Sequence, residues 1–502
     1  MKKDNLMKGT LVLSIGAILA KIFSAVYRIG LTRILGGEGI GLYQLVFPLY
    51  SLCVVLATAG LPMAISKVIA KSKCRGKAVV KKCLFFVMII SLILSFILIS
   101  CSKGLARVQG EEKISICYII LAPSIILVSG CSVLRGYFQG IGNFTPSAVS
   151  NIIEQFVKLC IGLILSLSLI GISLLASIVG AMISIVASEL ISLFILLIYY
   201  KKNVLPEQSH SNLEIKDLLK DILPITLTNI ILPIASFADS ILVVNLLNIN
   251  FKQSTSVFLY GLESGAVSSL VSLPTIFSFA IASVILPSIT SANTGENRDI
   301  VLRVAIKIIL IITLPFVLCF ALIPDRLITL LYGNGLDAMG IGGQNVAYRL
   351  LTISGFGAIF LAISQVYSSC LQAVDERMAS VRNLAIAVLL KFIIELIFMP
   401  SLMLNIYVLS ISNLVCYITV MVLNHFEIKQ HFKLKFNYIF TGKLILCNSF
   451  MLLTLIIVLG FSNSWSNTLL AIAVAGISYV ASLVLTKIFT KRDLAMIKYK
   501  VK

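Results

Sequence analysis

Long apolar runs and short polar connections alternate along the whole chain. Each run has about 20 residues, the length that a helix needs to cross the hydrocarbon core of a bilayer. The runs are continuous and do not alternate at every second residue, which excludes the strands of a membrane-spanning β-barrel. The pattern predicts an all-α membrane protein with about fourteen transmembrane helices. The predicted helices cover residues 10–31, 42–66, 83–102, 114–135, 147–168, 172–200, 221–247, 258–289, 301–323, 345–371, 380–400, 402–424, 441–460 and 466–487.

The composition agrees with a multi-span membrane protein and excludes a soluble enzyme. Of the 502 residues, 59% are hydrophobic and 12% are charged, whereas an ordinary soluble domain has about 25% charged residues. The mean hydropathy of +1.04 is more than one buried core can account for. Lys21 and Arg28 interrupt the first apolar run and no small-residue cleavage site follows it, so we expect a retained helix instead of a secretion signal.

The positive charge indicates an orientation in the membrane. The net charge is +20, from 41 Lys and Arg against 21 Asp and Glu, but the basic residues lie in short connections and not on one polar face or in a tail. We therefore expect no nucleic-acid partner. Cytoplasmic connections carry the excess of Lys and Arg in membrane proteins. Most of these residues fall on one side if both termini are cytoplasmic, which also requires an even number of spans.

The residues that bind metals or perform covalent catalysis form no pattern here. The 11 cysteines fall mostly inside apolar runs and are interpreted as small apolar residues. The 3 histidines lie in polar connections and form no ligand cluster. No nucleophile is paired with a base, so we expect neither an enzyme nor a cofactor or metal.

A polar connection of mixed charge after the sixth run predicts a division of the chain. The predicted parts are an N-terminal six-helix lobe (1–200), a cytoplasmic linker (201–220), a C-terminal six-helix lobe (221–424), and helices 13 and 14 with a basic tail (425–502).

The two lobes are predicted to be repeats. Three residues of the first lobe recur at one constant spacing in the second: Gln139, Ser147 and Lys158 become Gln372, Ser380 and Lys391. Since an even number of spans separates the copies, the repeats are parallel and related by an axis along the membrane normal. Two such lobes around a central cleft are typical of an alternating-access transporter. No filter-like loop is repeated, so a channel is not expected.

Helix 1 has a basic stripe at membrane depth. Lys21 and Arg28 are seven residues apart and therefore lie on one face of the helix, with Ser24 between them. A charge at mid-bilayer costs at least about 2.5–3.5 kcal/mol on insertion scales. One interpretation is a basic wall of a central cavity that binds an anionic substrate. The alternative is that Lys21 and Arg28 extend to the membrane surface.

Each lobe also has a pair of opposite charges at the spacing of one helical turn. Glu154 and Lys158 form the pair in helix 5, and Lys391 and Glu395 form the pair in helix 11. Because Lys158 and Lys391 are related by the repeat, we expect both pairs to face the cleft and bind substrate. The alternative is a structural ion pair that only offsets its own desolvation.

Other intramembrane acids have weaker assignments. Asp239 follows Pro233 in helix 7, where a broken backbone could leave carbonyls free for a cation. It is a candidate site for coupling transport to protons or sodium ions. The alternatives are an ion pair with Arg28 and a role in packing alone. Glu263 is expected at the membrane interface, and Glu189 and Lys307 near helix ends.

A glycine-rich stretch between helices 4 and 5 resembles a phosphate-binding loop only in part. It runs from Arg135 to Asn143 without the Gly-Lys-Ser/Thr sequence or the strand that such a loop requires. We expect a cytoplasmic helical hairpin.

Several motifs resemble a known family. These motifs are Lys8–Thr10 with Arg33–Gln44, Ala59–Lys67, and Leu134–Gly140. They resemble the polysaccharide-biosynthesis branch of the multidrug/oligosaccharidyl-lipid/polysaccharide (MOP) exporter superfamily, and especially its members from endospore formers. The resemblance implies a multi-pass protein of the bacterial cytoplasmic membrane that flips an undecaprenyl-pyrophosphate-linked sugar. The expected substrate is lipid II, the peptidoglycan precursor, for spore cortex synthesis.

Three functions follow from these features. The first is a lipid-linked oligosaccharide flippase, in which Lys21, Arg28, Lys158 and Lys391 offset the charge of a pyrophosphate. The second is a cation-coupled multidrug exporter that depends on Asp239. Drug-exporting relatives typically have an acid in helix 1, and none lies between Gly9 and Arg33. The third is a membrane scaffold without transport activity, for which cell-wall synthesis enzymes would be the partners.

Overall fold

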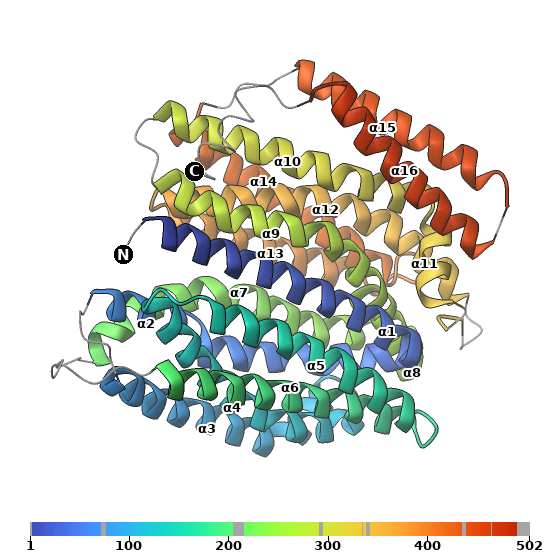
Figure 1. The fold of residues 1–502 in the computed structure, drawn as a ribbon. Coiled ribbons are helices and arrows are strands. Elements are labelled where there is room, and N and C mark those ends of the chain that lie inside the picture. Colours follow the sequence, from blue (N-terminus) through green and yellow to red (C-terminus); the bar gives the residue numbers. More distant parts are fainter. Residues whose placement is uncertain are drawn as a thin grey trace. The chain divides into compact units, whose positions relative to one another are not determined.

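The computed structural model describes residues 3–71, 77–203, 215–290, 295–333, 335–337, 342–433, 438–462 and 464–488 (Figure 1). These residues form α-helices and two short turns of other helix types, and no strand occurs among them. The helices are α1 (Lys3–Thr58), α2 (Leu61–Lys71), α3 (Lys77–Val108), α4 (Ser115–Gly140), α5 (Thr145–Leu169), α6 (Leu174–Asn203), α7 (Ile215–Leu247), α8 (Gln253–Gly261), α9 (Ser268–Thr290), α10 (Gly295–Leu322), α11 (Pro324–Tyr332), α12 (Gly343–Ala373), α13 (Arg377–Phe398), α14 (Tyr407–His431), α15 (Tyr438–Leu459) and α16 (Trp465–Leu485). A 3-10 turn, η1 (Glu112–Ile114), precedes α4, and a π-helical turn, η2 (Leu262–Val267), follows α8.

The predicted membrane helices correspond to helices of the structure. In the described part of the chain, 12 helical stretches are long and apolar enough to cross a membrane. The first of them, Ile15–Ala70, contains two predicted runs. The predicted run 380–400 corresponds to α13, whose charged residues keep it out of the 12. The prediction of an all-α, multi-pass membrane protein is confirmed.

A glycine divides α1 into two predicted spans. The backbone of Gly36 has φ 66° and ψ −172° inside an otherwise helical segment. Only glycine adopts this region readily, because it has no Cβ. The helix therefore changes direction at Gly36, between the predicted runs 10–31 and 42–66.

The chain forms two compact units, which we describe separately. Unit 1 contains residues 1–269, 338–343 and 394–409, and unit 2 contains residues 270–337, 344–393 and 410–502. The units are defined by contacts between residues, whereas the lobes were predicted from the order of the helices along the chain. The lobe boundaries therefore stay a prediction. The central part of the predicted linker (204–214) and the basic tail from residue 489 lie outside the described residues.

Small residues allow close packing in unit 1. A Cβ added to Gly16 of α1 would lie 2.9 Å from the Cβ of Ala148 in α5. A Cβ added to Gly162 of α5 would lie 2.5 Å from the Tyr27 ring of α1. Small residues at such contacts let membrane helices approach closely. As a result, the first half of α1 packs tightly against α5.

A second close contact joins the second half of α1 to α8 and η2. A Cβ added to Gly41 would lie 2.1 Å from the carbonyl oxygen of Val257, and one added to Gly261 would lie 2.1 Å from that of Gly37. Gly37 and Gly41 are four residues apart, as are Gly261 and Gly265. This backbone-to-backbone contact brings the π-helical turn against α1.

Unit 2 has its own polar contacts between helices. The amide of Asn383 on α13 donates to Asn424 Oδ1 on α14 over 3.0 Å, and Asn424 donates to the hydroxyl of Ser368 on α12 over 3.1 Å. Farther along, the hydroxyl of Tyr479 on α16 donates to the carbonyl of Ile311 on α10 over 2.7 Å. These bonds satisfy polar groups that would be costly in hydrocarbon.

The glycine-rich stretch differs from the prediction. Helix α4 continues to Gly140, so Arg135 lies inside the helix and not in the connection. The turn is limited to residues 141–144, before α5. Gly136 and Gly140 serve packing: a Cβ on Gly136 would lie 2.8 Å from Pro62 Cα, and one on Gly140 would lie 2.8 Å from Ile69 Cβ.

Candidate functional site

Two stripes of different character run along the first half of α1. At about 100° per residue, Lys21, Ser24 and Arg28 share one face. Lys21 is exposed, and Ser24 and Arg28 are half-buried. The second stripe is apolar and 41–49% exposed, and it consists of Ile15, Leu19, Ile22 and Val26. Its members lie roughly 100–180° around the helix from those of the polar stripe. The face suited to lipid is therefore distinct from the face that carries the basic residues.

The π-helical turn places a backbone oxygen next to Arg28. In η2, the amide of Ser268 donates to the carbonyls of Glu263 and Gly265, so the carbonyl of Ser264 is skipped. That carbonyl accepts a bond from Nη2 of Arg28 over 3.3 Å and a second bond from Nε2 of Gln44. π-Helical turns are frequent at functional sites because they free such groups. Both halves of α1 are thus linked to one carbonyl.

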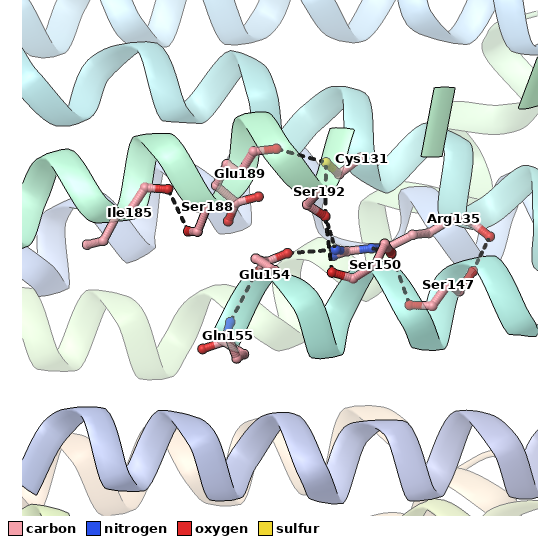
Figure 2. A network of polar contacts seen from close by, with 10 residues as sticks. All are labelled: Cys131, Arg135, Ser147, Ser150, Glu154, Gln155, Ile185, Ser188, Glu189 and Ser192. Carbon is pink, nitrogen blue, oxygen red and sulfur yellow. Dashed lines mark hydrogen bonds and ion pairs between the residues drawn. The ribbon is translucent and has the colours of Figure 1, made fainter. Parts of the chain in front are cut away.

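A buried ion pair connects α4 to α5 (Figure 2). Nη2 of Arg135 lies 2.6 Å from Oε2 of Glu154, and the two side chains are 19% and 9% exposed. The same guanidinium donates to the hydroxyls of Ser192 over 2.9 Å and Ser150 over 3.2 Å. Gln155 donates to the other oxygen of Glu154 over 2.9 Å. The network holds Arg135 in one orientation between three helices.

The expected pair of Glu154 and Lys158 is not formed, since each residue has another partner. Glu154 is bound by Arg135. The ammonium group of Lys158 lies 5.2 Å from the centre of the Tyr27 ring and 5.6 Å from that of Phe47, both on α1. A cation over an aromatic face is stabilised by the ring quadrupole. Lys158 is therefore held near α1 without a carboxylate.

Glu189 was expected near a helix end and lies instead in the middle of α6. It is 8% exposed, and its carbonyl accepts a bond from the Cys131 thiol over 3.8 Å. Its side chain extends into the same region as Glu154 and Arg135 (Figure 2). In the described structure, the Oε2 atom of Glu189 has no hydrogen-bond partner. Both Arg135 and Glu189 belong to a network that the sequence did not reveal.

Asp239 and Glu263 have different surroundings. Asp239 is half-buried on α7. Glu263 is 3% exposed in η2, where α1 packs against this turn. Its expected place at the membrane interface stays a prediction. A further network joins α7 to the end of α3: Nε2 of Gln109 donates to the carbonyl of Leu45 and to the hydroxyl of Ser240, each over 2.8 Å.

Lys391 and Glu395 lie one turn apart on α13, as predicted from their spacing. Lys391 is 5% exposed and Glu395 is fully buried. Their role as a pair equivalent to a pair in the first lobe stays a prediction.

Among the described residues, no group of three or more His, Cys, Asp and Glu side chains is arranged to hold a metal ion.

Comparison with known proteins gives consistent matches. Residues 6–293 match the family model described as polysaccharide biosynthesis protein. Over 353 residues the chain is 28% identical to stage V sporulation protein B of Bacillus subtilis (strain 168), covering 66% of this chain and 68% of the relative. It is 23% identical over 434 residues to the lipid II flippase MurJ of the same organism, covering 78% and 77%. The resemblance seen in the sequence motifs is confirmed.

A solved structure shows the same fold. The lipid II flippase MurJ in an inward closed conformation matches with a TM-score of 0.72 at 17% identity, over 95% of this chain and 99% of that chain. At this level of identity the likeness establishes the fold alone. Together with the apolar helices, the matches identify a multi-pass bacterial membrane protein.

Proposed function

Because the chain belongs to the polysaccharide biosynthesis protein family, we propose that it is a flippase for lipid-linked oligosaccharides. The names of its relatives support this class, since one is a lipid II flippase and another is a stage V sporulation protein. Transport of this kind needs no covalent chemistry. Its physical task is to carry a polar headgroup across a medium in which unpaired polar groups cost several kcal/mol each.

The proposed substrate is an undecaprenyl-pyrophosphate-linked glycan, namely lipid II for synthesis of the spore cortex. Pyrophosphate requires cationic hydrogen-bond donors along its path. Lys21, Arg28, Lys158 and Lys391 are the basic residues at membrane depth that we assign to this task. Ser24 would bind glycan hydroxyls, and Glu154 and Glu395 would orient the basic groups.

The single observation that best supports this proposal is the arrangement of the two stripes on α1. Lys21 and Arg28 share a face that differs from the exposed apolar face of Ile15 and Val26. A helix at the edge of a hydrated cleft has this pattern, with one side for lipid and one for the substrate. The prenyl tail could then remain in the bilayer while the headgroup follows the basic face.

We propose that the transport cycle is alternating access between the lobes 1–200 and 221–424, with both termini in the cytoplasm. The excess of Lys and Arg in the connections assigned to that side supports the orientation. The recurrence of Gln139 and Lys158 as Gln372 and Lys391 supports two parallel repeats. Rocking of such repeats exposes a fixed site to either side in turn.

The test is a fluorescent lipid II translocation assay in proteoliposomes. The double variant Lys21→Ala and Arg28→Ala removes both charges of the basic face. Charge-assisted hydrogen bonds contribute about 1.5–3 kcal/mol each, so we expect a translocation rate lower by roughly tenfold or more. Lys103→Ala, which removes an exposed lysine near the end of α3, is the control and should translocate normally. A double variant that folds and translocates at the wild-type rate would remove these residues from the substrate path.

A further inference from the structure

The carboxyl group of Glu189 is buried in unit 1, beside that of Glu154. The residue is 8% exposed in the middle of α6. Neither a hydrogen bond nor an ion pair holds its Oε2 atom in the part of the chain that the structure describes. Its neighbour Glu154 is equally buried but is bound by Arg135 and Gln155. Both carboxyl oxygens of Glu154 therefore accept hydrogen bonds, whereas Oε2 of Glu189 accepts none.

Charged and titratable groups approach Glu189 from every helix packed against it. They are Cys131 and Arg135 on α4, Glu154 and Lys158 on α5, and Tyr50 on α1. Of the two cations, the guanidinium of Arg135 is already bound by Glu154, Ser150 and Ser192. The second, Lys158, lies over the rings of Tyr27 and Phe47. Neither cation forms an ion pair with Glu189.

We propose that Glu189 is a proton-binding site, which takes up a proton from water at Oε2 and releases it again during the transport cycle. Binding forms one O–H bond at Oε2 as an O–H bond of a hydronium ion breaks, which leaves a neutral carboxyl group and a water molecule. Release reverses this step. Burial without a partner disfavours the charged form of a carboxyl group, so proton uptake is the chemistry for which Glu189 is suited.

The ligand of this site is a proton and not a metal cation. A sodium ion would need several oxygen ligands around it, but the guanidinium of Arg135 occupies the region between Glu154 and Ser192. A fixed positive charge at that position repels a second cation. A proton on Oε2 adds no ion to the network and requires no displacement of Arg135.

Proton binding would be coupled to the substrate through Lys158, and this part rests on the proposed function. When Lys158 leaves the rings of Tyr27 and Phe47 to bind a pyrophosphate, its charge moves away from Glu189. The carboxylate then loses its favourable interaction with this cation and binds a proton. Departure of the substrate returns Lys158 to the rings, and the proton is released.

The first test does not depend on any substrate. Infrared difference spectra of the purified protein in lipid nanodiscs are recorded during a pH titration. Among the carboxylic C=O bands of the 21 Asp and Glu residues, the wild type should show one that belongs to Glu189 and disappears as the pH rises. We expect Glu189→Gln to lose this band and Glu189→Asp to keep it with a shifted midpoint. Asp299→Asn, which alters a buried acid of unit 2 that accepts a bond from the Lys433 amide, should keep it unchanged. A band that persists in Glu189→Gln, or a wild type without one, would overturn the proposal.

The second test concerns coupling. Coupling energies typically correspond to factors of about 5–150, so a pH gradient should change lipid II translocation by roughly fivefold or more in the wild type and in Asp299→Asn. In Glu189→Gln we expect a change below about twofold. A Glu189→Gln protein that responds to the gradient as the wild type does would contradict coupling at this residue. If the wild type translocates no lipid II at all, the proposed function fails, whereas the infrared titration still decides the proton site.

Discussion

Arg135 Nη2 lies 2.6 Å from Glu154 Oε2, which makes a buried ion pair between two helices of unit 1. A second pair in the same unit, Arg107 with Glu112, has almost the same distance of 2.7 Å, but its side chains are 72% and 68% exposed. The two pairs have similar N–O distances but differ in burial, and Arg135 also donates to Ser150 and Ser192. Their comparison therefore measures what the buried network contributes beyond the contact itself.

We expect Arg135→Ala to destabilise the protein by about 3–5 kcal/mol, because it leaves the carboxylate of Glu154 buried without its partner. Arg107→Ala should cost no more than about 1 kcal/mol, since water replaces the partner at the surface. Denaturant unfolding in detergent micelles measures both differences. Replacing Arg135 and Glu154 together by Met should cost less than Arg135→Ala alone. Equal losses for Arg135→Ala and Arg107→Ala would show that the network does not stabilise unit 1.

The contact of α1 with α8 and η2 predicts which glycines are indispensable. At Gly41 and Gly261 an added Cβ would lie 2.1 Å from a backbone oxygen, and a backbone atom cannot move aside as a side chain can. We expect Gly41→Ala and Gly261→Ala to lose most of the monodisperse protein in detergent size-exclusion chromatography. Gly104→Ala is the matched control, since nothing lies within 4 Å of its added Cβ. A normal elution profile for Gly41→Ala would contradict the close approach.

The shared carbonyl of Ser264 predicts that Gln44 and Arg28 act together. Gln44→Met removes one donor but leaves Arg28 within 3.3 Å, so its cost in the wild-type background should be small. Gln44→Glu places a carboxylate oxygen against the carbonyl and should destabilise the protein by about 1–3 kcal/mol. Hydrogen exchange at residues 262–268 should become faster in Gln44→Glu.

The same pair can be tested by a double-mutant cycle. In an Arg28→Met background, Gln44→Met should cost more than it does alone, because the carbonyl then has no donor from α1. Equal costs in the two backgrounds would mean that the two donors do not share the carbonyl.

The helices were predictable because hydropathy along the chain is a one-dimensional signal. Bilayer thickness fixes the length of a span, and the break between the runs 10–31 and 42–66 falls at Gly36, as in the structure. The error at Arg135 arose from interpreting its glycines as turn residues. Gly136 and Gly140 are spaced by one helical turn, and this spacing is also typical of small residues at a helix contact.

The partners of charged residues could not be predicted in the same way. Sequence spacing suggests partners within one helix, and so it paired Glu154 with Lys158. The true partner, Arg135, comes from another helix and depends on the packing of α4 against α5 and α6. One signal for Glu189 was present: Ser184, Ser188 and Ser192 recur every four residues beside it and are all buried. A polar stripe within an apolar run indicates a face turned toward protein.

The orientation of the chain is a prediction that fusion proteins can check. With both termini in the cytoplasm, the connection between α3 and α4 around Gly110 lies on the opposite side of the membrane. Alkaline phosphatase fused after Gly110 should be active, because the enzyme requires an oxidising compartment to form its disulfides. The same enzyme fused after the last residue should be inactive, and a green fluorescent protein at that position should fluoresce. Active phosphatase at the C-terminus would reverse the orientation and place the basic connections on the outer surface, against the distribution of Lys and Arg.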